Sequence, residues 1–175
     1  GREAAVKAAS LGARTDRERA FIDAVNVFYA DSDKTPHGAR AQAYSRAMEQ
    51  VSRRFPDDHE AAIFYALSLL GTAPPSDATF ANQKKAAAIL NAILPLEPEH
   101  PGIAHYMIHS FDYPELAREA LPAARAYSKI APSSPHPLHM PSHIFTRLGL
   151  WQESVASNIA AAGAGVERIV HLGTA

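Results

Sequence analysis

The segment PEHPGIAHYMIHSFDYPELAREALPAARAYSKIAP, residues 98–132, decides the fold expected of this chain. It contains two stretches of helical character, 101–111 and 114–130, and a proline stands at each of its ends. Pro101 occupies the first turn of the first stretch, where a helix needs no backbone N–H. Strand signals, such as alternating β-branched residues or an Asn-Gly hairpin, are essentially missing from the chain. The segment therefore predicts a pair of helices.

The spacing of prolines predicts that this pair is repeated. Pro98 and Pro132 are 34 residues apart, and Pro56 and Pro98 are 42 apart, which is 34 plus an insertion of 8. Similar helical stretches lie before and after the segment, so we expect about eight helices and no sheet. The expected units are residues 16–56, 57–98, 99–132 and 135–163, within a single domain of residues 1–175.

Two helix starts carry a capping box, in which an N-cap side chain and a glutamate three residues later bond each other's backbone N–H groups. The first is predicted at Thr15 with Glu18, and the second at Asp57 with Glu60. Two prolines fall inside expected helices, Pro122 and Pro141, and an interior proline kinks or breaks a helix. We therefore expect bent or late-starting helices at those places, and a frayed or truncated end after Gly163.

The 34-residue period of helix pairs resembles the tetratricopeptide repeat over roughly residues 16–163. That family places small residues where its helices pack, an aromatic residue late in the first helix and a proline after the second. In the last unit Ser142, Phe145 and Ala161 match this pattern, and Phe111 and Ala120 match it in the unit before. The phrase PHPLHMPSHIFTRLG, residues 135–149, also resembles a segment of uncharacterised bacterial tetratricopeptide proteins.

The resemblance implies an all-α fold of antiparallel helix pairs stacked as a right-handed solenoid. It also implies a concave groove, lined by the first helix of each unit, that binds a protein or peptide. Phe145 and Trp151 take packing positions in the family pattern, so we expect both to be largely buried.

Histidines are the most informative residues for function. His105 and His109 are four residues apart, His139 and His143 are four apart, and the two pairs are separated by 34 residues. Residues four apart stack on one face of a helix. In a tetratricopeptide array both pairs would lie on the groove face of a first helix, and His136 lies one turn before His139. We therefore expect the histidines to share one surface.

Three interpretations of this surface remain open. It can bind a divalent metal such as zinc, copper or nickel, for which imidazole is a common ligand. It can be a groove for a peptide or organic ligand, or its histidines can pack without any ligand. The metal ligands would be His105, His109, His139 and His143, with His136 joining them. The groove would add hydrogen-bonding groups from Tyr106, Tyr113 and Arg147. Asp112 lies nearby but is expected to cap a helix opening at Pro114.

Signatures of an enzyme are poor. His59 and Glu60 begin like a zinc-protease helix, but Ile63 stands where the second histidine is required. The Gly-x-Ser-x-Gly motif of hydrolases and a phosphate-binding glycine loop are both missing. The sequence favours a scaffold that binds a partner over a catalyst. The alternative is a metal-binding protein or metalloenzyme that uses the histidines.

The amino-acid composition limits the classes of partner that we expect for this chain. Lysine plus arginine (17) nearly balance aspartate plus glutamate (18), so no basic surface for nucleic acid is expected. The chain contains no run of 18 apolar residues, so we expect no insertion in a membrane. The chain has no cysteine, which excludes disulfides and thiolate metal ligands but identifies no compartment, so cytoplasm and periplasm both remain open. It starts at Gly1 rather than methionine, so we expect a piece of a longer protein. A cut repeat array exposes an apolar face, so a homodimer through a terminal helix is a further expectation.

Overall fold

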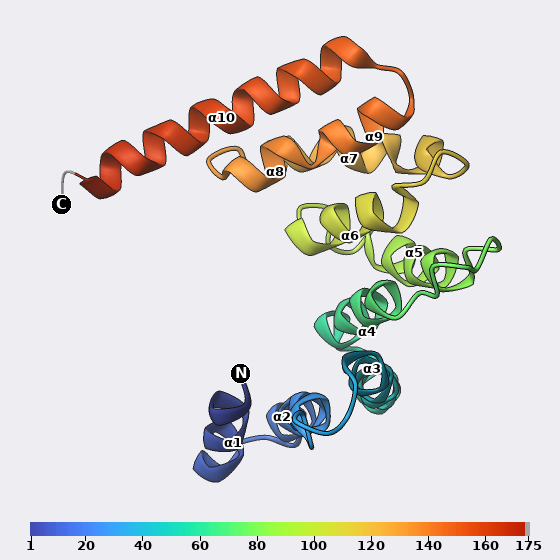
Figure 1. The fold of residues 1–175 in the computed structure, drawn as a ribbon, viewed down its shortest axis with the longest axis vertical. Helices are drawn as coiled ribbons and strands as arrows, with labels where there is room; N and C mark the ends of the chain where they lie inside the picture. Colours follow the sequence, from blue (N-terminus) through green and yellow to red (C-terminus); the bar gives the residue numbers. More distant parts are fainter. Residues whose placement is uncertain (174–175) are drawn as a thin grey trace. The chain divides into compact units, whose positions relative to one another are not determined.

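The computed structural model describes residues 1–173, and over that range it is built of helices joined by turns, without a strand. The all-helical prediction is confirmed. The chain divides into two compact units, Gly1–Ile89 and Leu90–Ala175. The helices of each unit can be followed along the chain in Figure 1.

The first unit contains α1 (Arg2–Leu11), α2 (Asp16–Tyr29), α3 (His37–Arg54), α4 (His59–Gly71) and most of α5 (Ala81–Ile93). The first four pack in chain order, α1 on α2, α2 on α3 and α3 on α4. Met48 of α3 and Ile63 and Ala66 of α4 are almost fully buried in this core. Burial of these apolar side chains stabilises the unit.

Helix α1 was not expected from the sequence. Its N-cap is Gly1, which has no side chain to cap the helix, so the start carries no capping signal. Only Ala5 of this helix is buried, whereas Val6 and Leu11 are exposed by 58% and 75%. Helix α1 buries little of its own surface, and its packing against α2 holds it in place.

One capping box is confirmed and the other is wrong. The Thr15 side chain accepts a hydrogen bond from the backbone of Glu18, whose carboxylate accepts in turn from the backbone of Thr15. Helix α4 instead starts one residue later than expected. Asp58, rather than Asp57, is its N-cap and accepts from the Ala61 backbone N–H at 3.3 Å.

The second unit contains the end of α5, then α6 (Pro101–Phe111), the short 3-10 helix η1 (Ala117–Ala120) and α7 (Leu121–Ile130). Helices α8 (Pro135–His139) and α9 (Pro141–Arg147) follow, and α10 (Trp151–Gly173) ends the described chain. In Figure 1 α8 and α9 continue one another, and α10 runs back along both. The expected helix after Gly149 is present, but the expected fraying after Gly163 is wrong because α10 continues to Gly173.

The interior prolines act as expected. Pro122 stands at the start of α7, which begins late, after the turn of η1. Pro141 opens α9 and separates it from α8. Each proline thus occupies a first-turn position, where its missing N–H removes no helical hydrogen bond.

Of the two aromatic residues expected to be buried, Phe145 is buried and Trp151 is not. Phe111 and Phe145 are both buried, at 8% and 7% exposure, as equivalent positions of a repeat should be. Trp151 is 61% exposed, so the expectation that it is buried is wrong. It is the first residue of α10, and the residue there that faces α9 is the buried Ser154, whose hydroxyl contacts that of Thr146 at 2.9 Å.

An apolar stripe remains exposed on α10. Trp151, Val155 and Ile159 follow one another at four-residue spacing, and each is more than half exposed. Such spacing places the three side chains on one helix face. Dimerisation through this terminal helix stays a prediction. Among the residues that the structure describes, no helix has the length and apolar character needed to cross a membrane.

Candidate binding face and histidine cluster

Helix α6 positions the first histidine pair. His105 and His109 are one turn apart on this helix, and their Nε2 atoms lie 3.0 Å from each other. The ring centroids are 4.7 Å apart. The opposite side of the helix is apolar, with Ile103 and Ile108 fully buried. Burial of that side turns the two imidazoles toward the surface.

The second pair spans the junction of α8 and α9. His139 ends α8 and His143 lies in α9, and their Nε2 atoms are 3.1 Å apart. Pro141 does not separate them, because Met140 keeps helical angles (φ −53°, ψ −36°) across the junction. The chain thus keeps the four-residue spacing that stacks side chains on one face.

His136 connects the two elements. Its Nε2 atom lies 3.0 Å from the Nε2 atom of His105, and the two rings meet edge to face. Helix α6 also packs against α9. We call His105, His109, His136, His139 and His143 the histidine cluster, and the surface of α6, α8 and α9 that carries it the histidine face. His136 therefore joins the first pair to α8, the helix that ends in His139.

Asp112 fixes one edge of this face. It follows α6 directly, and its carboxylate accepts from the His143 Nδ1 and from the Arg147 Nε, each at 3.0 Å. The expectation that Asp112 caps a helix at Pro114 is wrong, because no helix starts there and the next, η1, begins at Ala117. Its carboxylate links one repeat to the next. Arg147, expected as a ligand-binding group, is held by this ion pair.

The tyrosines occupy different places. The Tyr106 ring lies 5.3 Å from the ring of His105, centroid to centroid. Tyr113 is in the turn between α6 and η1, where its backbone N–H donates to the Phe111 carbonyl oxygen at 2.7 Å. Tyr127 of α7 was not predicted as a site residue, yet its ring stacks on His105 at 5.4 Å. Its helical position in sequence resembles that of any core aromatic residue, so no signal marked it.

Asn158 is a second residue that the sequence analysis missed. Its side-chain oxygen lies 2.7 Å from the Nδ1 of His139, although 19 residues separate them. The Asn158 amide nitrogen donates to the Ser154 carbonyl oxygen at 2.9 Å. Contact between α10 and α8 brings these groups together, and no local pattern in the sequence encodes it.

The environment keeps part of the cluster neutral. Burial, together with the positive charge of the neighbouring His109, His136 and His143, lowers the pKa of His105 to about 4. Burial and the neighbouring His143 also lower the pKa of His109, while the Asp112 carboxylate opposes that shift. Near pH 7 both rings are therefore neutral, which is the form that binds metals and can both donate and accept hydrogen bonds.

The ring nitrogens of the histidine cluster face one another in pairs, and each pair is a candidate set of metal ligands. Among residues 1–165, whose side chains the structure describes, no group of three or more His, Asp or Glu is arranged to hold a metal ion. The contacts that do occur join Nε2 atoms two at a time, at 3.0 to 3.1 Å. The four-histidine ligand set expected from the sequence remains untested as a single site.

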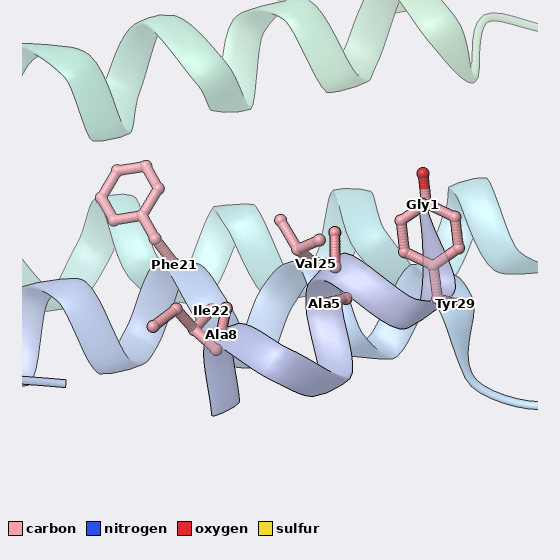
Figure 2. Close-up of a pocket in the computed structure, with 8 residues that line it drawn as sticks. Gly1, Ala5, Ala8, Phe21, Ile22, Val25 and Tyr29 are labelled. Carbon is pink, nitrogen blue, oxygen red and sulfur yellow. The ribbon is translucent and has the colours of Figure 1, made fainter. Parts of the chain in front are cut away.

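A separate apolar hollow lies in the first unit. It has a volume of about 410 Å³ and lies between α1 and α2 (Figure 2). Figure 2 shows the side chains that line it, including those of Ala5, Phe21, Val25 and Tyr29. None of the site residues predicted from the sequence lines this hollow.

Comparisons with known proteins support the fold and no more. No family model matches the chain, and no curated protein matches its sequence. A solved structure named "MamA MSR-1 C2", of a tetratricopeptide-containing protein, superposes with a TM-score of 0.66 at 12% sequence identity. The match covers 95% of this chain and 87% of that one. At this identity the likeness shows the fold, which is that of a tetratricopeptide-like helical repeat.

Proposed function

We propose that the chain is a helical repeat scaffold that binds a protein or peptide partner on its histidine face. The observation that carries this proposal is the gathering of polar, accessible side chains from two successive helix pairs on that face. The tetratricopeptide-like fold supports a role in protein interaction.

The chemistry of the face suits a peptide backbone. Neutral imidazoles present both donors and acceptors, and an extended peptide carries N–H and C=O groups that need such partners. His109 and His136 are exposed and come from different helix pairs, so one bound segment can contact both. The Asp112–Arg147 pair adds a charged edge to the same face.

The test is a peptide selection followed by titration. A random peptide library is selected on the purified chain, and the affinity of each selected peptide is measured by calorimetry. We expect His109→Ala combined with His136→Ala to weaken binding by about tenfold or more, the effect of losing interface residues that contribute at least 1.4 kcal/mol. Lys129→Ala, on the exposed surface of α7, is the matched control and should bind like the parent.

Two results would contradict the proposal. One is a library that yields no binding peptide. The other is a set of peptides whose affinity is unchanged by the double histidine variant, or falls equally in the Lys129 control. Because His109 and His136 are exposed, circular dichroism should show the helical content of the parent in the double variant.

Metal binding is a second candidate function, favoured by a different observation. Imidazole Nε2 atoms of the cluster face one another at 3.0 to 3.1 Å, a distance at which the two nitrogens can share a proton or bind one metal ion. The residues around one pair, His139 and His143, give the strongest support for metal binding.

A further inference from the structure

We infer that His139 and His143 form a two-histidine site for a divalent transition-metal ion, with Cu²⁺ preferred over Ni²⁺ and Zn²⁺. Their Nε2 atoms are 3.1 Å apart at the junction of α8 and α9. The side chain of His143 is 35% exposed, so an ion can reach the pair from solvent. What the pair can bind depends on which nitrogen of each ring carries the proton.

The contacts of His143 determine its tautomer. Its Nδ1 lies 3.0 Å from a carboxylate oxygen of Asp112, and an ionised carboxylate can only accept a hydrogen bond. The other oxygen of Asp112 accepts from the Arg147 Nε, which holds the carboxylate in place. In the neutral ring the proton is therefore on Nδ1, and the Nε2 atom of His143 carries a lone pair.

The contacts of His139 lead to the same result. Its Nδ1 lies 2.7 Å from the side-chain oxygen of Asn158. The amide nitrogen of Asn158 donates to the Ser154 carbonyl oxygen, which orients the amide with its oxygen toward the ring. An amide oxygen accepts hydrogen bonds, so the Nδ1 of His139 carries the proton and its Nε2 also has a lone pair.

Two lone pairs that face each other need a cation between them. Nitrogen atoms 3.1 Å apart, each about 2.0–2.1 Å from one ion, subtend an angle of about 100° at that ion. That angle lies between the square-planar and tetrahedral geometries that Cu²⁺ and Zn²⁺ adopt. A second ring nitrogen bonded to a carboxylate or amide oxygen is also the usual outer-shell support of a metal-ligating histidine.

The ligand set defines the class of ion. No third His, Asp or Glu in the described part of the chain joins the pair, so water would complete the coordination. Imidazole favours Cu²⁺ over its neighbours in the first transition row, whereas Mg²⁺ and Ca²⁺ require oxygen ligands. The inference does not depend on the proposed peptide partner, because the ion alone is the ligand.

The test is calorimetric titration of the untagged chain with Cu²⁺, Ni²⁺ and Zn²⁺, and with Mg²⁺ as a negative control. We expect one tight Cu²⁺ site per chain that is lost in His139→Ala and in His143→Ala. His37→Ala, a histidine that packs on Phe28 outside the cluster, should bind like the parent. Asn158→Ala keeps both ligands but removes the support of His139, and should weaken binding by about 10–100-fold.

The inference is overturned if the parent binds none of the three ions, which would mean that only a proton bridges the pair. It is equally overturned if the affinity for Cu²⁺ is unchanged in either histidine variant. Asn158 is exposed, so we expect Asn158→Ala to keep the fold, and its circular dichroism spectrum should match that of the parent. The titrations contain no peptide, so their outcome is separate from that of the peptide selection.

Discussion

At the scale of single residues, the histidine face depends on partners that are distant in sequence. The spacing of His139 and His143 predicts their contact, because residues four apart stack on a helix. Their partners Asp112 and Asn158 lie 31 and 19 residues away and are brought in by neighbouring helices. The sequence could thus predict the imidazole pairs, but not the tautomers that decide what the pairs bind.

Two aromatic residues give a matched stability test at this scale. Phe145 is 7% exposed and Trp151 is 61% exposed. Truncating a buried aromatic side chain costs about 3–5 kcal/mol, so we expect Phe145→Ala to lower the melting temperature strongly. Trp151→Ala removes a larger side chain but leaves no cavity, and should melt close to the parent. The reverse order in thermal melts would show that α10 packs differently on α9.

At the scale of helices, a start signal predicts the first residue correctly where tertiary contacts agree with the local motif. Thr15 and Asp16 are adjacent and both suit an N-cap, but Thr15 has Glu18 three residues later, and α2 starts with that capping box. Asp57 and Asp58 are adjacent and both suit an N-cap. The choice between them depends on Arg17 of α2, which pairs with the carboxylate of Asp58. Tertiary contact, which a local motif does not contain, decided the start of α4.

The two aspartates therefore provide a prediction with a built-in control. Asp58 caps α4 and pairs with Arg17, which holds the pKa of that carboxyl below its usual range. Asp58→Ala should reduce the free energy of unfolding by about 1–2 kcal/mol, the cost of losing a helix cap. Asp57→Ala, at an exposed neighbour, should cost little. Urea denaturation of the two variants checks this, and equal losses would contradict the assigned cap.

At the scale of the whole molecule, proline spacing and hydrophobic pattern predicted the class of fold. The chain is helical from α2 onward, as expected, and the added helix α1 was missed because it lacks a start signal. The boundary between the two compact units falls inside α5, so no change in amino-acid composition indicates it. The face that carries the histidines lies within the second unit.

The free energy of unfolding should depend on whether the histidines of this face are protonated, and therefore on pH. The pKa of His105 is about 4 in the folded chain, against an ordinary value of 6.5, and that of His109 is lowered too. Between the folded-state pKa and the ordinary pKa, the unfolded chain binds more protons than the folded chain. The contribution of these histidines to the free energy of unfolding is therefore fully present above pH 6.5 and is lost as the pH falls toward the folded-state pKa. The groups that face His105 are His109, His136, His143, Tyr106 and Tyr127.

We therefore expect the melting temperature to fall between pH 7.5 and pH 5, and to fall less in His105→Gln. His37→Gln, outside the cluster, should keep the slope of the parent. Thermal melts followed by circular dichroism at several pH values measure this. A melting temperature that stays level or rises on acidification would contradict the neutral state assigned to His105.

The measurement that tests the account most directly is a zinc titration followed by long-range ¹H–¹⁵N NMR of the histidine rings. Before zinc, His139 and His143 should show the tautomer with the proton on Nδ1, because Asn158 and Asp112 accept from that atom. As Zn²⁺ is added, the Nε2 resonances of these two rings should shift together, while those of His37 stay in place. Protons on Nε2 in the free chain, or zinc-induced shifts that leave both rings unmoved, would contradict the account.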